Sequence, residues 1–421
     1  MIKTIPVEDL RVGMFVEDFN VSWLDHPFLS NRRRLRSPDE IRAVIDHGIK
    51  SVSIDTELGP DSPGAFSPEE SPVGAPKKLL SEIEALPAPA QPTPRTPYEE
   101  ELRRARTIHA RAKRVVEELL NDARVGKSID GEKAKAVVDD MVESIFRNPD
   151  ALTSLSRLKS FDEYTFQHSV NVSVLCLALG RHLGILKGEL KCLGVGALLH
   201  DVGKVLIPQE ILNKPGRLTE EEFERVRTHP LHGAKLLMRC GELPKSCATV
   251  ALNHHERFDG RGYPRGLSGL HIGKFGLISA IVDVYDAITS NRVYHRAISG
   301  HEAVKKIYEW GKTDFQPIYV QKFIQCLGIY PTGSVVRLDT GEVGVVSRQN
   351  PDHLLRPWIR IVRDGAGGPV TPPLEVDLSL PDPKRRGAYA RSVEAPLDIE
   401  PERLDAGAVL GGEARAEEDQ A

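Results

Sequence analysis

The sequence has few of the features that mark membrane, secreted or nucleic-acid-binding proteins. Its longest apolar stretches, residues 170–180 and 275–288, contain polar side chains well before the roughly 20 apolar residues that a helix needs to cross a bilayer. The amino-terminal segment MIKTIPVEDL has no apolar core, which argues against a secretory signal. The net charge is −4, whereas a nucleic-acid scaffold normally carries a basic face. We therefore expect a cytoplasmic protein without a membrane span and without a nucleic-acid partner.

Cysteine is also scarce, and its placement argues against a disulfide framework. The 421 residues include five cysteines, and none of them forms a Cys-x-x-C pair. Most lie in apolar segments with helical periodicity, as expected of reduced core thiols rather than of disulfides or zinc ligands. The five are Cys176, Cys192, Cys240, Cys247 and Cys326.

Composition and turn signals divide the amino-terminal part of the chain. With 40% hydrophobic and 28% charged residues, the chain is long enough for one sizeable core and one or two small domains. Residues 1–57 are predicted to form a small α+β domain, because Ser37-Pro38-Asp39-Glu40 is a strong helix start and a strand is expected over residues 50–54. Residues 58–97 are rich in proline and alanine, which is typical of an extended linker.

Residues 98–150 are predicted to form a helical connector. From residue 102 to residue 123, six apolar residues and His109 recur at alternating steps of three and four, the pattern of a short coiled-coil seam. Two interpretations follow: the seam joins two copies of the chain into a homodimer, or it packs on the protein's own helical domain. Because the pattern is short, it does not decide between them.

The remaining segments differ in character. Residues 151–330 read as helical throughout, and residues 331–380 as a small β segment with a hairpin around the turn Asp339-Thr340-Gly341 and a third strand over residues 358–362. Residues 381–421 are polar, alanine-rich and acidic, and are predicted to be disordered. The expected fold class is therefore mainly α, with a small α+β amino-terminal domain and a short carboxy-terminal β segment.

One short stretch within the helical region points to chemistry. His200 and Asp201 interrupt the apolar run ALLHDVGK at residues 197–204, which otherwise reads as a buried helix. An ionised carboxylate beside an imidazole is costly in an apolar setting unless the two groups are hydrogen-bonded, paired or bound to a metal ion. The pair therefore needs partners elsewhere in the chain.

Several histidines and one aspartate in apolar segments can supply these partners. A single such histidine is usually a satisfied core residue, but the full set holds five imidazoles and two carboxylates with no thiolate, which suits Mn or Fe. Because the set exceeds what one ion normally takes, it predicts a two-metal site with a bridging carboxylate and a metal-bound hydroxide that attacks a phosphoryl centre. The candidate ligands are His168, His200, Asp201, His229, His254, His255 and Asp283.

Four segments resemble a known family. LLHDVGK, KPGRLT, HPLHGAKLL and, above all, HHERFDGRGYP at residues 254–264 are similar to the HD-GYP family, the HD metal-dependent phosphohydrolases that degrade cyclic di-GMP. The likeness extends in order over residues 161–328. It implies an all-helical HD-type domain at residues 151–330. The amino-terminal segment LRVGMFVEDFNVSWLDHPF resembles the small accessory domain often found ahead of HD-GYP domains in bacterial proteins.

The resemblance implies roles for individual residues. The metal ligands would be the seven residues named above, with Asp201 as the bridge. Lys204 would reach the scissile phosphate and stabilise its charge or help to protonate the leaving oxygen, and Gly203 would let a ligand approach closely. Tyr263 would form a wall of the substrate pocket, and Arg292 would bind phosphate through its planar, forked donors.

The chain departs from the family at two places that bear on the site. Where some members hold a third ion with a glutamate, this chain has Tyr164, so we expect two divalent ions, Fe or Mn. The usual R-P-Y-x-K segment reads Arg292-Val293-Tyr294-His295-Arg296, so His295 takes the place of a lysine that contacts the substrate phosphate. Substrate affinity, or the preference among cyclic dinucleotides, is expected to differ accordingly.

The function that the resemblance implies is hydrolysis of cyclic di-GMP to pGpG, to GMP or to both, in bacterial second-messenger signalling. One alternative is a regulatory module with little catalysis, which binds a cyclic dinucleotide or docks signalling proteins such as diguanylate cyclases. Another is an HD hydrolase of a different nucleotide, such as ppGpp. The intact ligand set favours catalysis over binding alone.

Overall fold

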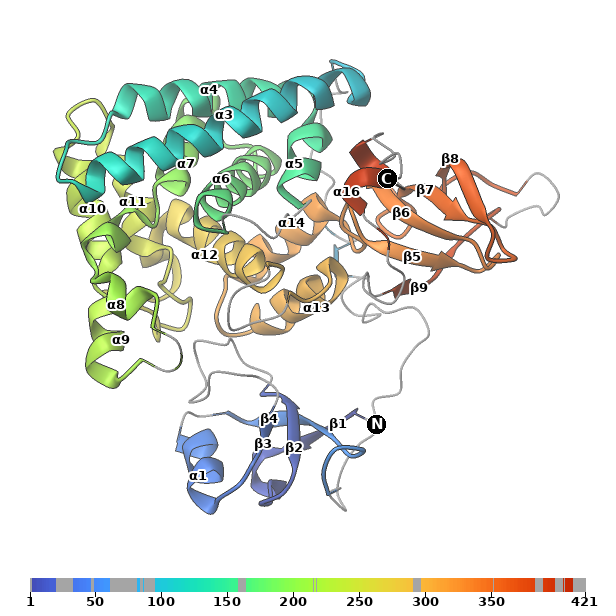
Figure 1. Ribbon diagram of the computed structural model, residues 1–421, viewed down its shortest axis with the longest axis horizontal. Coiled ribbons are helices and arrows are strands. Elements are labelled where there is room, and N and C mark those ends of the chain that lie inside the picture. Colours follow the sequence, from blue (N-terminus) through green and yellow to red (C-terminus); the bar gives the residue numbers. More distant parts are fainter. Residues whose placement is uncertain are drawn as a thin grey trace, which may run out of the picture. The chain divides into compact units, whose positions relative to one another are not determined.

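The computed structural model describes residues 2–19, 33–46, 49–60, 82–83, 86, 95–157, 164–214, 216, 218–290, 297–350, 352–382, 389–397, 404 and 406–411. These residues form two compact units, one built mainly from the amino-terminal residues and one built from most of the chain beyond residue 72 (Figure 1).

The amino-terminal unit is a small α+β domain, as predicted. Its sheet is antiparallel in the order β1-β4-β2-β3. Ser37 Oγ accepts a hydrogen bond from the backbone N–H of Glu40 at 3.3 Å, which confirms the helix start. The unit has its own apolar core, to which all three longer strands contribute. Its elements are β1 (Ile2–Pro6), η1 (Val7–Asp9), β2 (Phe15–Asp18), β3 (Arg33–Arg34), α1 (Pro38–Asp46) and β4 (Ser51–Asp55).

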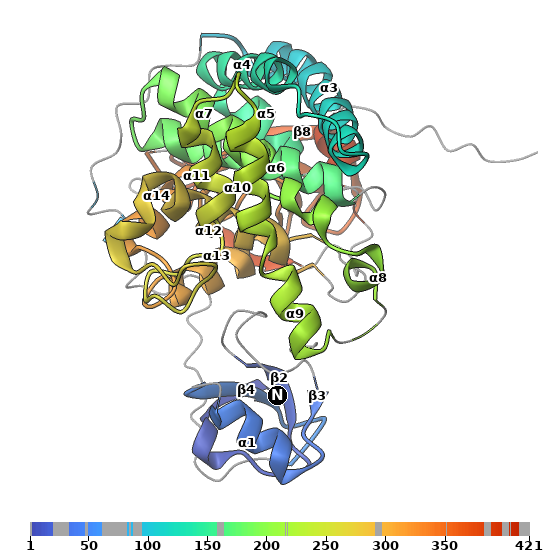
Figure 2. The same ribbon diagram turned by 90° about the vertical axis from the view of Figure 1, so that its left-hand side faces the viewer.

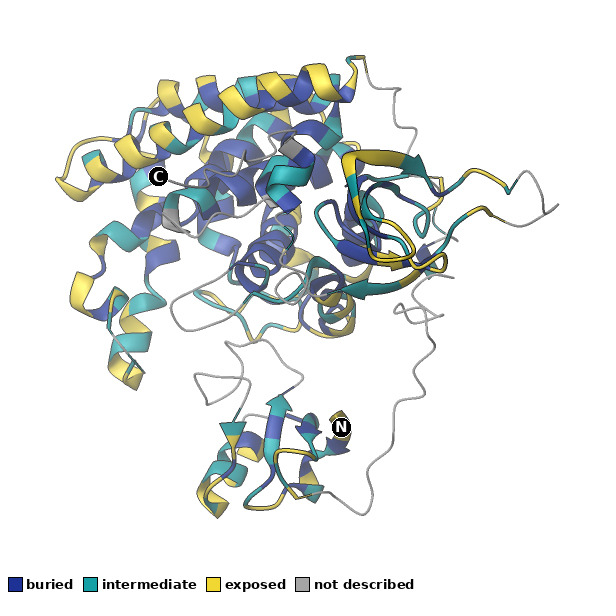
Figure 3. Ribbon diagram, turned by 45° about the vertical axis from the view of Figure 1, so that its right-hand side comes forward, coloured by how far each residue is buried: buried dark blue, intermediate teal, exposed yellow. Residues whose placement is uncertain are grey.

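The larger unit is a helical bundle, in line with the predicted fold class. Helix α12 is buried at every position from Phe275 to Ile288, and α6 lies beside it in the interior (Figure 2). Figure 3 shows that burial is concentrated in these inner helices, whereas the outer helices keep one exposed face. None of the helices within the described ranges is long and apolar enough to cross a bilayer. The helices are α3 (Tyr98–Arg124), α4 (Gly131–Arg147), α5 (Pro149–Arg157), α6 (Tyr164–His182), α7 (Lys187–Leu198), η2 (Val202–Leu206), α8 (Gln209–Leu212), α9 (Glu220–Val226), α10 (His229–Arg239), α11 (Lys245–Asn253), η3 (Gly269–Ile272), α12 (Gly273–Ile288), α13 (Gly300–Trp310) and α14 (Pro317–Leu327).

Helix α3 carries the heptad-like pattern, and it packs on the protein's own helices. Its apolar side chains, including Leu102, Val116 and Leu119, belong to the same core as those of α4, α6 and α7. The fully buried carboxylate of Glu101 accepts hydrogen bonds from Arg147 at 2.7 and 2.8 Å and from Ser144 at 2.7 Å, which joins α3 to α4. The apolar seam of α3 thus packs on the protein's own helical domain, which was one of the two interpretations of the pattern.

Two residues of the predicted linker also belong to this unit. Ile83 is fully buried in the helical core. The carboxylate of Glu82 accepts hydrogen bonds from the Tyr308 hydroxyl at 2.9 Å and the Gln321 side-chain amide at 3.2 Å. The expectation of an extended linker is therefore wrong at these two positions, because one apolar side chain in a proline-rich stretch suffices to anchor it on α13 and α14.

The carboxy-terminal part forms an antiparallel sheet in the order β8-β7-β6-β5-β9. The predicted hairpin and third strand are confirmed as β5, β6 and β7. The disorder predicted for residues 381–421 is wrong for β9 and α16, because β9 pairs with β5, while Ala406 and Leu410 of α16 pack on the apolar side chains of the sheet. The elements are β5 (Val335–Leu338), β6 (Val343–Arg348), β7 (Trp358–Arg363), β8 (Pro369–Asp377), β9 (Val393–Leu397) and α16 (Ala406–Gly411).

Candidate metal centre

The structure brings all seven predicted ligands together in the core of the helical unit. They come from five segments: the first turns of α6, the turn after α7, the start of α10, the end of α11 and the second half of α12. The sequence reading placed His200 and Asp201 within a helix, but α7 ends at Leu198. The pair lies in the turn between α7 and η2, where both side chains are buried.

The ligand atoms fall into two groups. One group contains Asp201, His229, His254 and His255, and within it the potential ligand atoms lie within 4.8 Å of one another. The second group contains His168, His200 and Asp283, with the same spread. Clusters of this kind with nitrogen and oxygen donors match the coordination that transition metals of the Mn and Fe type accept.

Asp201 stands between the two groups. Its Oδ1 lies 3.3 Å from His229 Nε2 and 3.8 Å from His254 Nε2. Its Oδ2 lies 3.5 Å from Nε2 of His200, in the other group. The two oxygens of this one carboxylate thus face different groups, which is the geometry expected of a bridging ligand.

Asp283 has a related position on α12. Its Oδ1 lies 3.2 Å from His168 Nε2 and 3.7 Å from His200 Nε2. Its Oδ2 lies 3.8 Å from His255 Nδ1 in the first group. Each of the two carboxylates therefore lies near both ligand groups, Asp283 from α12 and Asp201 from the turn after α7.

Backbone carbonyls orient three of the imidazoles. The Nδ1–H groups of His200, His229 and His254 each donate to the carbonyl oxygen three residues earlier, at 2.7–2.9 Å. This arrangement selects the tautomer in which Nε2 carries the free lone pair, and it directs Nε2 toward the centre.

A carboxylate that sequence reasoning missed orients the fourth imidazole. His168 Nδ1 donates to Asp286 Oδ2 at 2.7 Å, and the Asn171 amide donates to Asp286 Oδ1 at 3.3 Å. His109 of α3 continues this chain of contacts, because its Nε2 lies 3.5 Å from the side-chain oxygen Oδ1 of Asn171. Asp286 follows Asp283 by three residues on α12, so helical spacing was the signal that could have revealed it.

Three buried polar atoms at the centre have no hydrogen-bond partner among the described residues. They are His200 Nε2, Asp201 Oδ1 and His255 Nδ1. Burying such atoms unsatisfied is costly, and native structures leave few of them. All three are potential ligand atoms that point to the centre, so the residues present fit divalent ions.

The protonation states also suit metal binding. Burial, followed by the neighbouring imidazoles, lowers the pKa of His254 and His255 well below the usual range. Burial alone would raise the pKa of Asp201, but Lys204 and the adjacent imidazoles outweigh it and hold that pKa well below the usual range. His254, His255 and Asp201 are therefore held in the neutral imidazole and ionised carboxylate forms that bind metal. Burial alone would lower the pKa of His168, but its hydrogen bonds with Asp283 and Asp286 outweigh burial and raise that pKa.

Comparison with known proteins identifies the family. Residues 141–317 match a family model described as HD domain, residues 2–134 match a domain of unknown function (DUF3391), and residues 335–380 match a KOW domain associated with HD domain. A cyclic di-GMP phosphodiesterase of Pseudomonas aeruginosa is 41% identical over 379 residues, which cover 90% of this chain and 89% of that protein. The chain belongs to the HD-GYP family.

Other relatives of this HD-GYP protein match over shorter parts of the chain. A cyclic di-GMP phosphodiesterase of Thermotoga maritima is 35% identical over 43% of this chain and 49% of its own length. A 3′3′-cGAMP-specific phosphodiesterase of Vibrio cholerae is 40% identical over 34% of this chain and 33% of its own length. Among solved structures, an HDG"Y"P protein from Bdellovibrio bacteriovorus has a TM-score of 0.45 and 19% identity over 77% of this chain and 98% of that chain.

The loop that carries the GYP sequence of this HD-GYP protein folds back on the end of α11. A Cβ on Gly262 would lie 2.3 Å from the Arg257 backbone nitrogen, so only glycine permits the approach. The buried carboxylate of Glu256 accepts hydrogen bonds from the backbone N–H groups of Arg265 at 2.9 Å and Leu267 at 2.8 Å. Glu256, the third residue of the HHE sequence, therefore holds the loop and is not among the ligand groups.

Gly203 has a different role from the predicted one. A Cβ at this position would lie 2.0 Å from the His229 carbonyl oxygen and 2.5 Å from the Gly233 backbone nitrogen. The missing side chain thus admits the backbone of α10 and not a ligand. The prediction was wrong because the sequence shows that a close approach is allowed but not which group approaches.

The predicted substrate contacts are only partly described. Lys204 Nζ donates to Asp201 Oδ2 at 2.6 Å, so its ammonium group lies at the centre. The Tyr263 ring stacks on His255, with centroids 4.6 Å apart and an interplanar angle of 29°. Arg292 and His295 lie outside the described residues.

Proposed function

We propose that this protein is a cyclic di-GMP phosphodiesterase that produces pGpG and GMP. The observation that carries the proposal is the pair of adjoining ligand groups, with the two Asp201 oxygens facing one group each. Two-metal centres of this kind clamp the attacking and leaving oxygens of a phosphoryl group. Relatives named for the same activity support the choice of substrate, one of them over nine-tenths of the chain.

The residues of the chain would divide the work as follows. Two divalent ions, when bound, supply a water nucleophile at neutral pH and neutralise charge on the phosphoryl centre. Asp201 and Asp283 hold both ligand groups at a constant separation. The ammonium group of Lys204, 2.6 Å from Asp201 Oδ2, is close enough to stabilise the phosphoryl oxygens or to give a proton to the departing 3′ oxygen.

The overall reaction is hydrolysis of one phosphodiester bond. The water oxygen forms a bond to phosphorus, the bond between phosphorus and the 3′ oxygen breaks, and a proton passes to that oxygen. The first product is linear pGpG, and repetition of the same step on it gives GMP. Tyr263, Arg292 and His295 are proposed to contact the substrate.

Fe or Mn is the proposed metal. The two ligand groups hold five imidazole and two carboxylate donors and no thiolate, which disfavours a structural zinc site. We further propose that the protein acts in the cytoplasm on a bacterial second messenger, where diguanylate cyclases or other signalling proteins, or a second copy of this chain, are candidate partners.

The test is the product profile of the purified full-length protein. Protein loaded anaerobically with Fe or with Mn is incubated with cyclic di-GMP, and the products are separated by chromatography. We expect pGpG and GMP from the native protein and neither from the variant that combines His200→Ala with Asp201→Ala. Arg103→Ala, on the exposed face of α3, is the control for purification. A folded, metal-bound native protein that leaves cyclic di-GMP intact would refute the proposal.

A second candidate substrate follows from one of the comparisons. The Vibrio cholerae relative named for 3′3′-cGAMP is 40% identical over 34% of this chain, which makes 3′3′-cGAMP the second candidate. Competition between cyclic di-GMP and 3′3′-cGAMP in one reaction decides the preference. We expect cyclic di-GMP to be consumed first.

A further inference from the structure

A layered stack of side chains lies against the metal centre. The ring of His255, one of the ligands, is covered by the ring of Tyr263 at 4.6 Å. The guanidinium group of Arg227 lies over the Tyr263 ring, 4.9 Å from its centroid. A cation is thus held against an aromatic ring that itself touches a ligand.

Two further observations tie the stack to the candidate ligands. The backbone N–H of Tyr263 donates to the His255 carbonyl oxygen at 3.1 Å, which ties the backbone of the tyrosine to that of the candidate ligand. Arg227 precedes His229 by two residues at the junction of α9 and α10, and His229 Nε2 faces the Asp201 carboxylate at 3.3 Å. The cation therefore belongs to the same rigid frame as the ligands.

Arg227 is also available to a ligand. Its side chain keeps 33% of its surface exposed. Its one charged partner in the described structure is Glu224, 2.7 Å away and itself 60% exposed. Exposed ion pairs contribute roughly 0–1 kcal/mol, so an anionic ligand can replace Glu224 at little cost.

Three other cations near the centre, all among the described residues, already have a partner. Lys204 is bound to Asp201 at 2.6 Å. Arg257 is buried, with its guanidinium group over the Phe315 ring. Arg265 donates to the Asn253 side chain at 2.8 Å.

A cyclic dinucleotide poses a specific electrostatic problem. It carries two phosphates, and while one lies at the metal ions the other keeps its negative charge. A planar guanidinium group can pair with such a phosphate through two parallel hydrogen bonds. We propose that Arg227, seated on Tyr263 beside the ligand His255, binds the uncut phosphate of the cyclic dinucleotide and so favours this substrate over single phosphodiesters. This inference rests on the proposed function.

The test compares two substrates. Cyclic di-GMP carries the second phosphate, whereas bis(p-nitrophenyl) phosphate carries only the one that is cut. Arg227→Ala is expected to raise KM for cyclic di-GMP about 10-fold, which corresponds to about 1.4 kcal/mol, and its loss of kcat/KM on cyclic di-GMP should exceed its loss on the nitrophenyl ester by the same factor. Arg227→Lys, which keeps the charge without the fork, should recover part of the difference.

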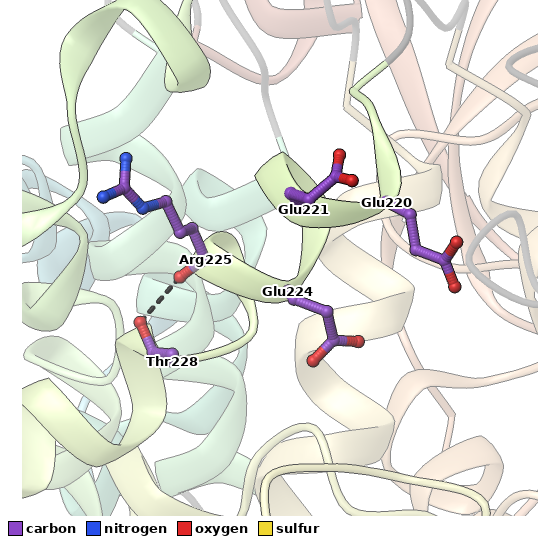
Figure 4. A pocket seen from close by; sticks show the side chains of 5 residues that line it. All are labelled: Glu220, Glu221, Glu224, Arg225 and Thr228. Carbon is purple, nitrogen blue, oxygen red and sulfur yellow. Dashed lines mark hydrogen bonds between the residues drawn. The ribbon is translucent and has the colours of Figure 1, made fainter.

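Arg225 provides the matched control. It lies on α9, two residues before Arg227, and is exposed. Figure 4 shows its side chain extending from α9 away from Glu220 and Glu224, in the pocket that these residues line. Arg225→Ala should leave kcat/KM unchanged on both substrates. Circular dichroism and metal content are measured for every variant.

Two results would overturn the inference. One is an equal loss on both substrates in Arg227→Ala, which would mean that the arginine only supports the Tyr263–His255 stack. The other is no loss on either substrate. Failure of the proposed function itself looks different: the native protein would cleave the nitrophenyl ester and leave cyclic di-GMP intact.

Discussion

Asp286 offers the sharpest test of the metal centre, because it touches only one of the two ligand groups. Its Oδ2 accepts a hydrogen bond from His168 Nδ1 at 2.7 Å, and His168 Nε2 faces Asp283 at 3.2 Å in the second group. Removing a carboxylate that supports a ligating histidine typically lowers metal affinity 10- to 100-fold. This range corresponds to about 1.4–2.7 kcal/mol.

Two substitutions separate the charge from the hydrogen bond. Asp286→Asn keeps an acceptor oxygen of similar size and removes the charge, so we expect about a 10-fold loss of affinity for one ion, at the lower end of the range. Asp286→Ala removes both the charge and the acceptor of the His168 Nδ1 hydrogen bond, so we expect a loss near 100-fold. In both variants the group around His229 and His254 should keep the native affinity, because Asp286 makes no contact with it among the described residues.

The assay is calorimetric titration of the metal-free protein with Mn²⁺, together with the metal-to-protein ratio after gel filtration. The native protein should bind two ions, and Asp286→Ala should retain one ion under conditions in which the second is lost. Asp139→Asn, at an ion pair on the surface of α4, is the control for an Asp to Asn change. Equal weakening of both ions, or no weakening of either, would show that Asp286 does not orient His168 for one site.

Three further predictions concern stability. Gly203→Ala places a Cβ 2.0 Å from the His229 carbonyl oxygen, so urea denaturation should show a loss of roughly 3 kcal/mol or a failure to fold. Glu101→Gln leaves the guanidinium group of Arg147 without its charged partner, and urea denaturation should show a loss of about 2–3 kcal/mol, less than for a fully buried pair because Arg147 keeps 30% of its side chain exposed. Burial lowers the pKa of His182 from 6.5 to about 4, so between these values the unfolded chain binds more protons and stability should fall as the pH falls. The expected loss from pH 6.5 to pH 5 is about 2 kcal/mol, and His182→Gln should reduce this pH dependence.

Each stability prediction has its own counter-result. Wild-type stability in Gly203→Ala would mean that η2 and α10 can separate without cost. For Glu101→Gln, an unchanged midpoint would show that the buried carboxylate contributes nothing beyond its packing. An equal slope of stability against pH in His182→Gln and the native protein would assign the acid sensitivity to other groups.

Sequence patterns predicted most of the local structure of this protein. The helix start at Ser37, the hairpin around Thr340 and the helical catalytic region all appear where local signals placed them, because caps, turns and helical periodicity are properties of neighbouring residues. The predicted disorder beyond residue 381 was wrong at β9, because composition averaged over a long polar tail hides a five-residue strand that forms only by pairing with β5.

The candidate ligands could be named from the sequence because they are polar residues in otherwise apolar segments. Such residues are conspicuous, since burying them without partners is costly. The residues that support the ligands were not conspicuous. His109 lies on a helix that reads as a coiled coil, and Arg227 lies in a polar stretch where a cation attracts no notice.

The sequence by itself thus identified the candidate metal ligands of this HD-GYP protein and predicted that their number exceeds the needs of one ion. Only the tertiary structure decided how they divide into two groups, because each group combines segments distant in the chain, such as α6 and α12 in the group of His168, His200 and Asp283. It also decided that Asp201 faces both groups, that Asp286 supports one of them, and that Gly203 admits a helix backbone. These are distances between atoms distant in the chain, and local sequence patterns do not encode them.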